Sequence, residues 1–253
     1  MCERRLTHWG AGIRFGRLCA SGGWHIGALV GASPCRLCGM SEKERMLAGE
    51  LYFADDPELN AMRMKKRKLE REFNDTPYDA FELRASIIRE LFGSTGKNCY
   101  VEPPFHCDYG CNTRVGDNFY ANFDCIFLDV APITIGNNVF FGPRVGLYTP
   151  YHPIDARVRG EGLEGGRTIT IGDDVWFGGN VVVCPGVTIG SDVVIGAGSV
   201  VVHDIPSHSV AVGNPCHVIR QISDADREYW EEKAQQYRAQ VNAECAAAEA
   251  NKA

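Results

Sequence analysis

Large apolar residues recur every six positions through most of residues 103–213. The inward positions that this period predicts are Pro103, Tyr109, Val115, Ala121 and Phe127, then Ile135, Phe141 and Leu147 after a two-residue slip, and Ile171, Phe177, Val183, Ile189, Ile195 and Val201 after a break at 150–168. We expect each unit to form a short strand with one inward side chain, often followed by a glycine that permits a tight corner. A β-sandwich would alternate apolar and polar residues between irregular turns, so the pattern predicts a mainly β chain, folded as a parallel β-helix of stacked coils.

The segments on both sides of the repeat have helical signals. Residues 41–93 are expected to be helical, because Ser41–Glu44 has the form of a capping box and Asp56-Pro57 and Thr76-Pro77 each fit an N-cap followed by proline. An Ala- and Glu-rich stretch after Ser223 predicts a terminal helix. The predicted organisation is an extension at 1–39, a helical subdomain at 40–98, the β-helix at 99–222 with its loop at 150–168, and a C-terminal helix at 223–253.

Residues 1–39 follow neither pattern. They are Gly-rich and carry five arginines against one acid, Glu3. This composition fits an organelle transit peptide, a disordered extension or a start codon assigned too early, and the helical signal directly after Met40 supports the last of these. Cys35 and Cys38 have the spacing of a metal or redox pair, but no second such pair follows. Because the segment has neither the six-residue period nor a helical stripe and precedes a capped start at Ser41, we expect it to be disordered and dispensable.

Composition and charge exclude some classes of function. The formal net charge of −6 argues against a general nucleic-acid surface, and no apolar run is long enough to span a bilayer. The basic run Arg63–Arg71 is interpreted as a solvated helix face or as a wall near an anionic or sugar ligand. Eleven scattered cysteines form no compact disulfide framework, which favours reduced thiols in a cytoplasmic location.

The break at 150–168 is the candidate for chemistry. The side chains of a loop expelled from a regular solenoid do not pack in its core, and binding or catalytic residues are common on such loops. His152 lies at its root, between Tyr151 and Pro153. A neutral imidazole is the side chain best suited to remove a proton near neutral pH.

Nearly the whole chain after Met40 resembles the galactoside and maltose O-acetyltransferases, a branch of the hexapeptide-repeat acyltransferases. The matching stretches are Met46–Tyr52, Glu102–Pro104, Asp108–Gly110, Asn118–Phe123, Tyr151–Pro153, Asp174–Gly179, Pro185–Gly190, Gly196–Ser199 and Gly213–Pro215. The resemblance implies a left-handed β-helix and a homotrimer with active sites between neighbouring subunits. It also implies acetyl transfer from acetyl-CoA to a hydroxyl of a maltose-, glucose- or galactoside-type sugar, without a metal.

The resemblance also implies roles for individual residues. His152 matches the general base, Asn122 matches the asparagine that fixes the acceptor near the reacting carbonyl, and the Gly179 N–H matches the donor to the oxyanion. On the acceptor side, in the helical subdomain and first coils, the expected residues are Asp55 or Asp56, Arg63, Asp108, Asn122 and Asp129. For acetyl-CoA they are Trp176, Ala197 and Arg220, with Val202, His203 and His217 at positions where the family has basic residues.

Alternatives remain at this stage. An acyltransferase of the same fold with a serine or antibiotic acceptor fits the repeat, although Met46–Tyr52 and Glu102–Asp108 favour a sugar. A zinc site like that of carbonic-anhydrase-like β-helices would need a third histidine beside His203 and His208. A non-catalytic trimeric scaffold would also have the fold, but it would not require His152 and Asn122.

Overall fold

The computed structural model describes residues 39–250. The expectations for residues 1–39, including those for Cys35 and Cys38, therefore fall outside the described residues except at Gly39. Within the described part of the chain, seven cysteines are unpaired; they are Cys99, Cys107, Cys111, Cys125, Cys184, Cys216 and Cys245. None of the helices in this part combines the length and apolar content that a membrane span requires.

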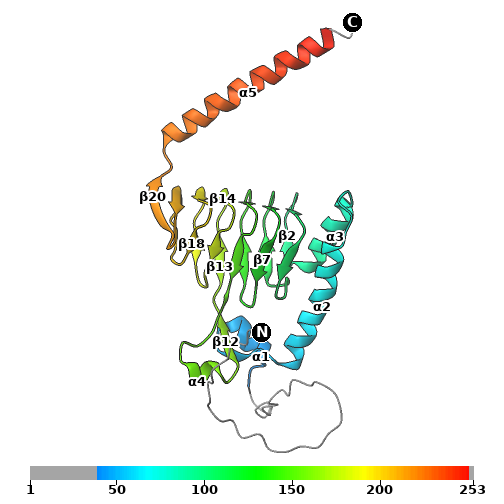
Figure 1. Ribbon diagram of the computed structural model, residues 1–253, viewed down its shortest axis with the longest axis vertical. Helices are drawn as coiled ribbons and strands as arrows, with labels where there is room; N and C mark the ends of the chain where they lie inside the picture. The colour runs from blue at the N-terminus through cyan, green and yellow to red at the C-terminus, as the bar shows by residue number, and fades with distance from the viewer. Residues whose placement is uncertain (1–38, 251–253) are drawn as a thin grey trace, which may run out of the picture. The chain divides into compact units, whose positions relative to one another are not determined.

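The repeat region forms a parallel β-solenoid with three sheets as its sides, as the six-residue period predicts (Figure 1). Sheet I consists of β4 (Phe105–Cys107), β7 (Cys125–Leu128), β10 (Gly146–Tyr148), β15 (Val182–Val183) and β18 (Val200–Val201). Sheet II consists of β2 (Ser94–Thr95), β5 (Thr113–Val115), β8 (Ile133–Ile135), β13 (Ile169–Ile171) and β16 (Thr188–Ile189). Sheet III consists of β3 (Tyr100–Val101), β6 (Tyr120–Ala121), β9 (Phe140–Phe141), β14 (Val175–Phe177), β17 (Val193–Ile195), β19 (Ser209–Val212) and the antiparallel β20 (His217–Gln221).

The register confirms the inward positions from Val115 onward and corrects the first two. Cys107 is paired with Phe127 in sheet I, and Val101 is paired with Ala121 in sheet III. The inward side chains of the first coil are therefore Val101 and Cys107, whereas Pro103 and Tyr109 lie in loops. The slip that the sequence placed after Phe127 also occurs one coil earlier, after Cys107.

Aromatic rings fill the centre of the solenoid. Phe105, Phe127, Phe141 and Phe177 are almost fully buried and contact one another edge to face, with the Phe141 and Phe177 ring centroids 4.6 Å apart. This geometry places the positive edge of one ring against the negative face of the next, which favours the pair beyond the area it buries. Each of these coils is therefore held to its neighbour through the core.

Glycines at the corners are required by space rather than by backbone freedom. A Cβ on Gly136 would lie 2.7 Å from the backbone oxygen of Gly172 in the next coil. The left-handed backbone conformation at this corner belongs to Asn138, with φ of 55°. The sequence pattern located these glycines correctly, but their role is to let successive corners stack.

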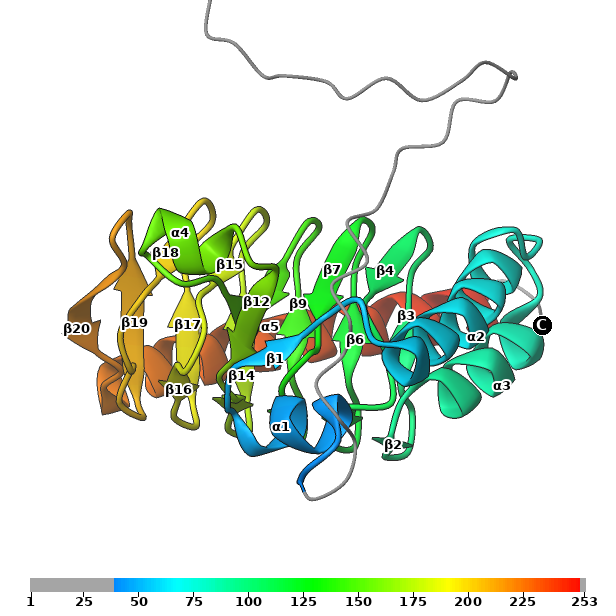
Figure 2. The same ribbon diagram turned by 90° about the horizontal axis from the view of Figure 1, so that it is seen from below.

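The segment before the first coil is helical. α1 (Glu42–Ala48) begins at a capping box on Ser41, and α2 (Pro57–Asn74) begins at N-cap Asp56, both as predicted. α3 (Phe81–Leu91) starts later than the Thr76-Pro77 signal indicated, because the Thr76 hydroxyl donates back to the Phe73 carbonyl instead of capping a helix. α2 and α3 lie at the β2–β3 end of the solenoid (Figure 2), where Phe73, Ile87, Ile88 and Leu91 join the main core.

Two further elements lie outside the coils. A small antiparallel sheet joins β1 (Tyr52–Phe53), β12 (Leu163–Gly166) and β11 (Pro150–Tyr151), so it ties the expelled loop to the N-terminal segment. This loop also contains the short helix α4 (Ala156–Arg159). At the other end of the chain, α5 (Asp224–Ala250) follows β20 as one long helix (Figure 1).

Candidate active site

One corner of the solenoid is wider than the others in three successive coils. At the corner between sheets I and II, the regular spacing of the inward residues is six, as between Val183 and Ile189. The same step is eight residues long from Cys107 to Val115 and from Phe127 to Ile135. In the third coil this corner contains the whole expelled loop. We call residues 108–112, 129–132 and 149–168 the widened corner. The extra residues allow the chain to place side chains outside the packed column.

Asp129 holds the first of these turns. Its carboxylate accepts hydrogen bonds from the backbone N–H groups of Tyr109, Gly110 and Asn112 at 2.8, 3.0 and 3.2 Å and from the Thr113 hydroxyl at 3.2 Å. Its side chain is fully buried, and burial raises its pKa to about 6 despite the backbone N–H donors. The carboxylate that the sequence placed among the acceptor contacts is therefore occupied with the backbone of the turn.

Asp108 is half-buried and directly precedes the turn residues that Asp129 holds. Burial raises the pKa of its carboxyl group, and the nearby cations Lys66 and Arg63 offset part of this rise. The buried Lys66 ammonium donates to Glu70 and to the Cys107 carbonyl, while Arg63 donates to the Tyr109 hydroxyl at 2.6 Å. Two members of the basic run in α2 therefore face the widened corner, so the run is more than a solvated helix face.

The structure separates the roles of the two adjacent aspartates near Arg63. Asp56 is buried, and its Oδ1 accepts hydrogen bonds from the Glu58 and Leu59 backbone N–H groups as the N-cap of α2. Asp55 is exposed, and its Oδ1 accepts a 2.7 Å hydrogen bond from Asn60. Of the two, Asp55 is the one that presents its carboxylate to solvent beside Arg63, which itself donates to Asn60.

His152 directly follows β11 at the root of the loop. Its side chain is 58% exposed, and its Nε2 lies 3.7 Å from Oε2 of Glu164, a distance for an ion pair when the imidazole is protonated. Glu164 is the cross-strand partner of Tyr52, and the fully buried Tyr52 hydroxyl donates to the other carboxylate oxygen. Burial, followed by the bond to Glu164, raises the pKa of Tyr52 far above its ordinary value, so the hydroxyl remains a donor.

A second group of expected residues lies at a different corner, where sheet III turns into sheet I. Asn122 follows β6 and Gly179 follows β14, and Ala197 follows β17 at the same corner. The Gly179 backbone N–H donates to no acceptor within residues 39–250. Trp176 is exposed on the outer face of sheet III, paired with Phe140, so it is not a coil-packing residue.

The remaining expected residues lie near the last coils. Val202 and His203 are exposed directly after β18, and His217 and Arg220 are exposed on β20. Arg220 already has a partner: its guanidinium donates two hydrogen bonds, of 2.7 and 2.9 Å, to Asp226 at the start of α5.

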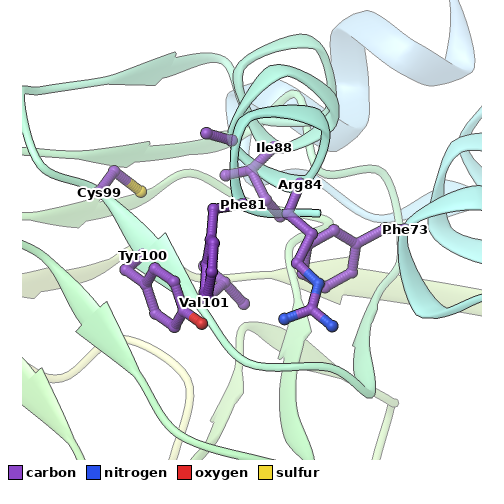
Figure 3. A pocket seen from close by; sticks show the side chains of 8 residues that line it. Phe73, Phe81, Arg84, Ile88, Cys99, Tyr100 and Val101 are labelled. Atoms are coloured by element: carbon purple, nitrogen blue, oxygen red, sulfur yellow. The ribbon is translucent and has the colours of Figure 1, made fainter. Parts of the chain in front are cut away.

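A pocket between α3 and β3 belongs to neither group (Figure 3). Phe73, Phe81 and Tyr100 line it together with the guanidinium of Arg84. Arg84 Nη1 lies 4.0 Å from Glu102 Oε2, and both atoms are buried without a hydrogen-bond partner in the described structure. None of the expected site residues lines this pocket, so it is a feature of the helix–solenoid contact.

Comparisons with known proteins identify the family of the chain. Residues 45–96 match the maltose acetyltransferase hexapeptide capping motif, and residues 168–203 match the bacterial transferase hexapeptide (six repeats). Galactoside O-acetyltransferase of Escherichia coli K12 is 44% identical over 191 residues, which cover 76% of this chain and 94% of that protein.

Solved structures show the same similarity. A maltose O-acetyltransferase from Clostridium difficile 630 is 56% identical, with a TM-score of 0.72, over 73% of this chain and 98% of that one. A hexapeptide-repeat acetyltransferase from Vibrio cholerae O1 biovar eltor, complexed with acetyl coenzyme A, is 42% identical, with a TM-score of 0.67, over 73% and 100%. The chain belongs to the galactoside and maltose O-acetyltransferase family.

Membership of this family makes the chain an acetyltransferase, and acetyl-CoA is the family's co-substrate. No cluster of three or more potential metal ligands occurs among the residues that the structure describes. His208, one member of the considered zinc pair, instead contacts Asp192 at 2.9 Å.

Sequence reasoning missed Glu164 and Tyr52 in this acetyltransferase. Tyr52 stood inside the matched stretch Met46–Tyr52, but its partner is more than a hundred residues away in the Gly- and Arg-rich part of the loop. A carboxylate within reach of a candidate base is a reasonable expectation for any expelled loop that holds a histidine. The loop contains three acids, Asp155, Glu161 and Glu164, and only the pairing of β1 with β12 distinguishes the last of them.

Proposed function

We propose that this acetyltransferase moves the acetyl group of acetyl-CoA to a hydroxyl of a sugar, with His152 as the general base. The observation that carries the proposal is the arrangement of His152, Glu164 and Tyr52 at the widened corner. The imidazole is exposed to an incoming acceptor, while the carboxylate beside it is held from behind by a buried hydroxyl.

The proposed reaction follows from these positions. Neutral His152 removes the proton of the sugar hydroxyl as its oxygen attacks the thioester carbonyl, a role worth ~10²–10⁴ in rate. As the carbonyl oxygen gains negative charge, it accepts a hydrogen bond from the backbone N–H of Gly179. Collapse of the tetrahedral intermediate breaks the C–S bond, and the imidazolium returns its proton to the leaving thiolate. Glu164 stabilises the imidazolium between these two steps.

The acceptor is proposed to lie against the turn 108–112. Asp108, Arg63 and Asp55 present a carboxylate, a guanidinium and a second carboxylate there, which suits the several hydroxyl groups of a sugar. Asp129 contributes by holding this turn rather than by contacting the acceptor. Asn122 is proposed to fix the acceptor from the opposite side.

The co-substrate is proposed to run along the second group. Trp176 and Ala197 are exposed beside Gly179, which suits the pantetheine arm and its thioester. Farther along, Val202, His203, His217 and Arg220 are proposed to meet the nucleotide end. Because Arg220 is paired with Asp226, its contact with a phosphate would compete with that pair.

A homotrimer is proposed on the same grounds. His152 and Asn122 lie at different corners of the coil, so one chain does not place them at one reaction centre. Closed cyclic symmetry would bring the His152 corner of one subunit against the Asn122 corner of its neighbour. Cytoplasmic location stays a prediction from the cysteines.

The direct experiment measures thiol release from acetyl-CoA by the full chain with a panel of sugars, and with serine as a non-sugar acceptor. Release that depends on a sugar and is lost in His152→Ala supports the proposal. Release with serine but with none of the sugars would contradict the sugar assignment, and release that His152→Ala leaves unchanged would contradict the base assignment.

A further inference from the structure

The terminal helix α5 has an apolar face that no other element within residues 39–250 covers. Trp230 and Tyr237 are 67% and 69% exposed. The two family segments that match this chain end at residue 203, before the helix begins. An isolated helix is only marginally stable in water, and an apolar stripe on a helix normally faces another surface. The acetyl-transfer site assigns no role to this face.

The face has the spacing of a coiled-coil seam. Trp230, Ala234, Tyr237 and Val241 follow one another at intervals of four, three and four residues. These intervals place all four side chains on one side of the helix, in alternating d and a positions of a heptad. Ala234 and Val241 are the least exposed residues of this stretch, whereas the rings of Trp230 and Tyr237 are exposed.

The flanking charges select the direction of the partner helix. In a parallel pair, Lys233 would face Arg238 of the second helix, so this contact would join like charges. Asp226, which is paired with Arg220, would face Glu231 and offer it no cation. In an antiparallel pair with Ala234 opposite Tyr237, Glu231 faces Arg238 of the second helix twice, and Lys233 faces Gln240.

The same antiparallel register also matches the seam by size. Trp230 lies opposite Val241 and Ala234 lies opposite Tyr237, so each layer joins a large side chain to a smaller one. Shifting the register by one heptad in either direction would place Glu231 against its own copy or Arg238 against its own copy. Only the central register satisfies both size and charge.

We propose that α5 is a self-association surface, which pairs antiparallel with α5 of a second copy of this chain. Such a contact is isologous and lies on a twofold axis. A cyclic trimer contains no twofold axis, so if the chain forms the trimer proposed above, the helix pairs join two trimers. Each seam is short, and three pairs acting together would raise the effective concentration of each.

Light scattering on the purified full chain, over a range of concentrations, tests the pairing without reference to activity. We expect Arg238→Glu to halve the molar mass, because it places Glu231 against an acid on both sides of the twofold axis. Glu231→Arg combined with Arg238→Glu reverses both charges and should restore the wild-type mass. Glu232→Arg, on the neighbouring outward position, is the matched control and should leave the mass unchanged.

Two results would overturn the proposal. One is the same mass for the wild-type chain and Arg238→Glu at every concentration, with both remaining helical by circular dichroism. In the other, Arg238→Glu lowers the mass but the double variant does not regain it. The antiparallel Glu231–Arg238 contact predicts that exchanging both charges restores the mass.

Discussion

The regular coils between β13 and β19 and the widened corner are built from one repeat, yet they differ in what their polar groups do. At the corners of the regular coils, polar side chains mainly bond to the next coil: Asp204 accepts from the Thr188 backbone N–H, and the Ser207 hydroxyl accepts from that of Ser191. At the widened corner, the extra residues carry His152, Glu164 and Asp108 away from the column. The regular corners therefore join the coils, whereas the widened corner holds the side chains that we propose for the chemistry.

Replacing a histidine in each region should give the largest contrast. We expect His152→Ala to lower kcat by ~10²–10⁴ without changing thermal stability, because it removes the proposed base from an exposed position. His208→Ala, at a regular corner, is the control and should retain turnover. Steady-state thiol release measures both, and equal losses of turnover in the two variants would contradict the contrast.

Stability should respond in the opposite sense. Phe177→Ala removes a buried ring that contacts Phe141 in the core, and we expect it to lower the free energy of unfolding by about 3–5 kcal/mol. Ile154→Ala in the expelled loop, where the side chain is 97% exposed, should change it by less than about 0.5 kcal/mol. Urea denaturation distinguishes the two, and a large loss at Ile154 would show that the loop is part of the packed core.

Asp129 connects the two regions, and its replacement should have an intermediate effect. Asp129→Asn places an amide N–H₂ donor against backbone N–H donors. We therefore expect the free energy of unfolding to fall by about 1–3 kcal/mol and the KM for the acceptor to rise. Asp204→Asn changes an exposed acceptor of one backbone N–H at a regular corner and should lower the free energy of unfolding by less.

The pH dependence has a definite sign. The native pKa of Asp129, about 6, lies above the ordinary value for an unfolded chain, so the folded state binds this proton more tightly. The stabilisation from this group is complete below the unfolded pKa and is lost as the pH rises through about 6. The stability gap between wild type and Asp129→Asn should therefore be larger near pH 5 than near pH 7; a gap that widens with pH would contradict the assignment.

Tyr52→Phe should give the smallest change. It removes the hydroxyl that holds Glu164 and leaves the ring in place, so we expect kcat to fall by about 10-fold, as for the loss of one hydrogen bond to a charged group. The KM for acetyl-CoA should not change, and the pH profile of kcat should shift because Glu164 is less firmly held beside His152. Tyr148→Phe in β10 is the control. If kcat falls in Tyr148→Phe and not in Tyr52→Phe, the role of Tyr52 is contradicted.

The sequence predicted the fold because the repeat is local. Six-residue spacing, the Ser41 capping box and the Asp56-Pro57 start each depend on neighbouring residues, and the structure confirms them. The cap expected at Thr76-Pro77 did not form, because the Thr76 hydroxyl donates to the Phe73 carbonyl and accepts a hydrogen bond from Arg84. The first two inward positions were wrong because the period slips twice, after Cys107 and after Phe127, and the sequence pattern revealed only the second slip.

The site could be predicted only in part. His152 could be proposed as the base because a break in a regular period is visible in the sequence. The partnership of Glu164 with Tyr52 and the inward direction of Asp129 depend on pairing between distant segments, which no local pattern encodes. The separation of His152 and Asn122 onto different corners also emerges only when the coils are stacked.

If His152 and Asn122 act together, they must come from different subunits, and subunit complementation tests this arrangement. His152→Ala and Asn122→Ala should each be nearly inactive alone. When the two variants are co-expressed and form mixed assemblies, random mixing in a cyclic trimer gives about a quarter of the interfaces both an intact His152 and an intact Asn122. We therefore predict about a quarter of wild-type activity in the mixed preparation. Mixed assemblies as inactive as either parent would contradict the account, because they would place both residues of each site on the same chain.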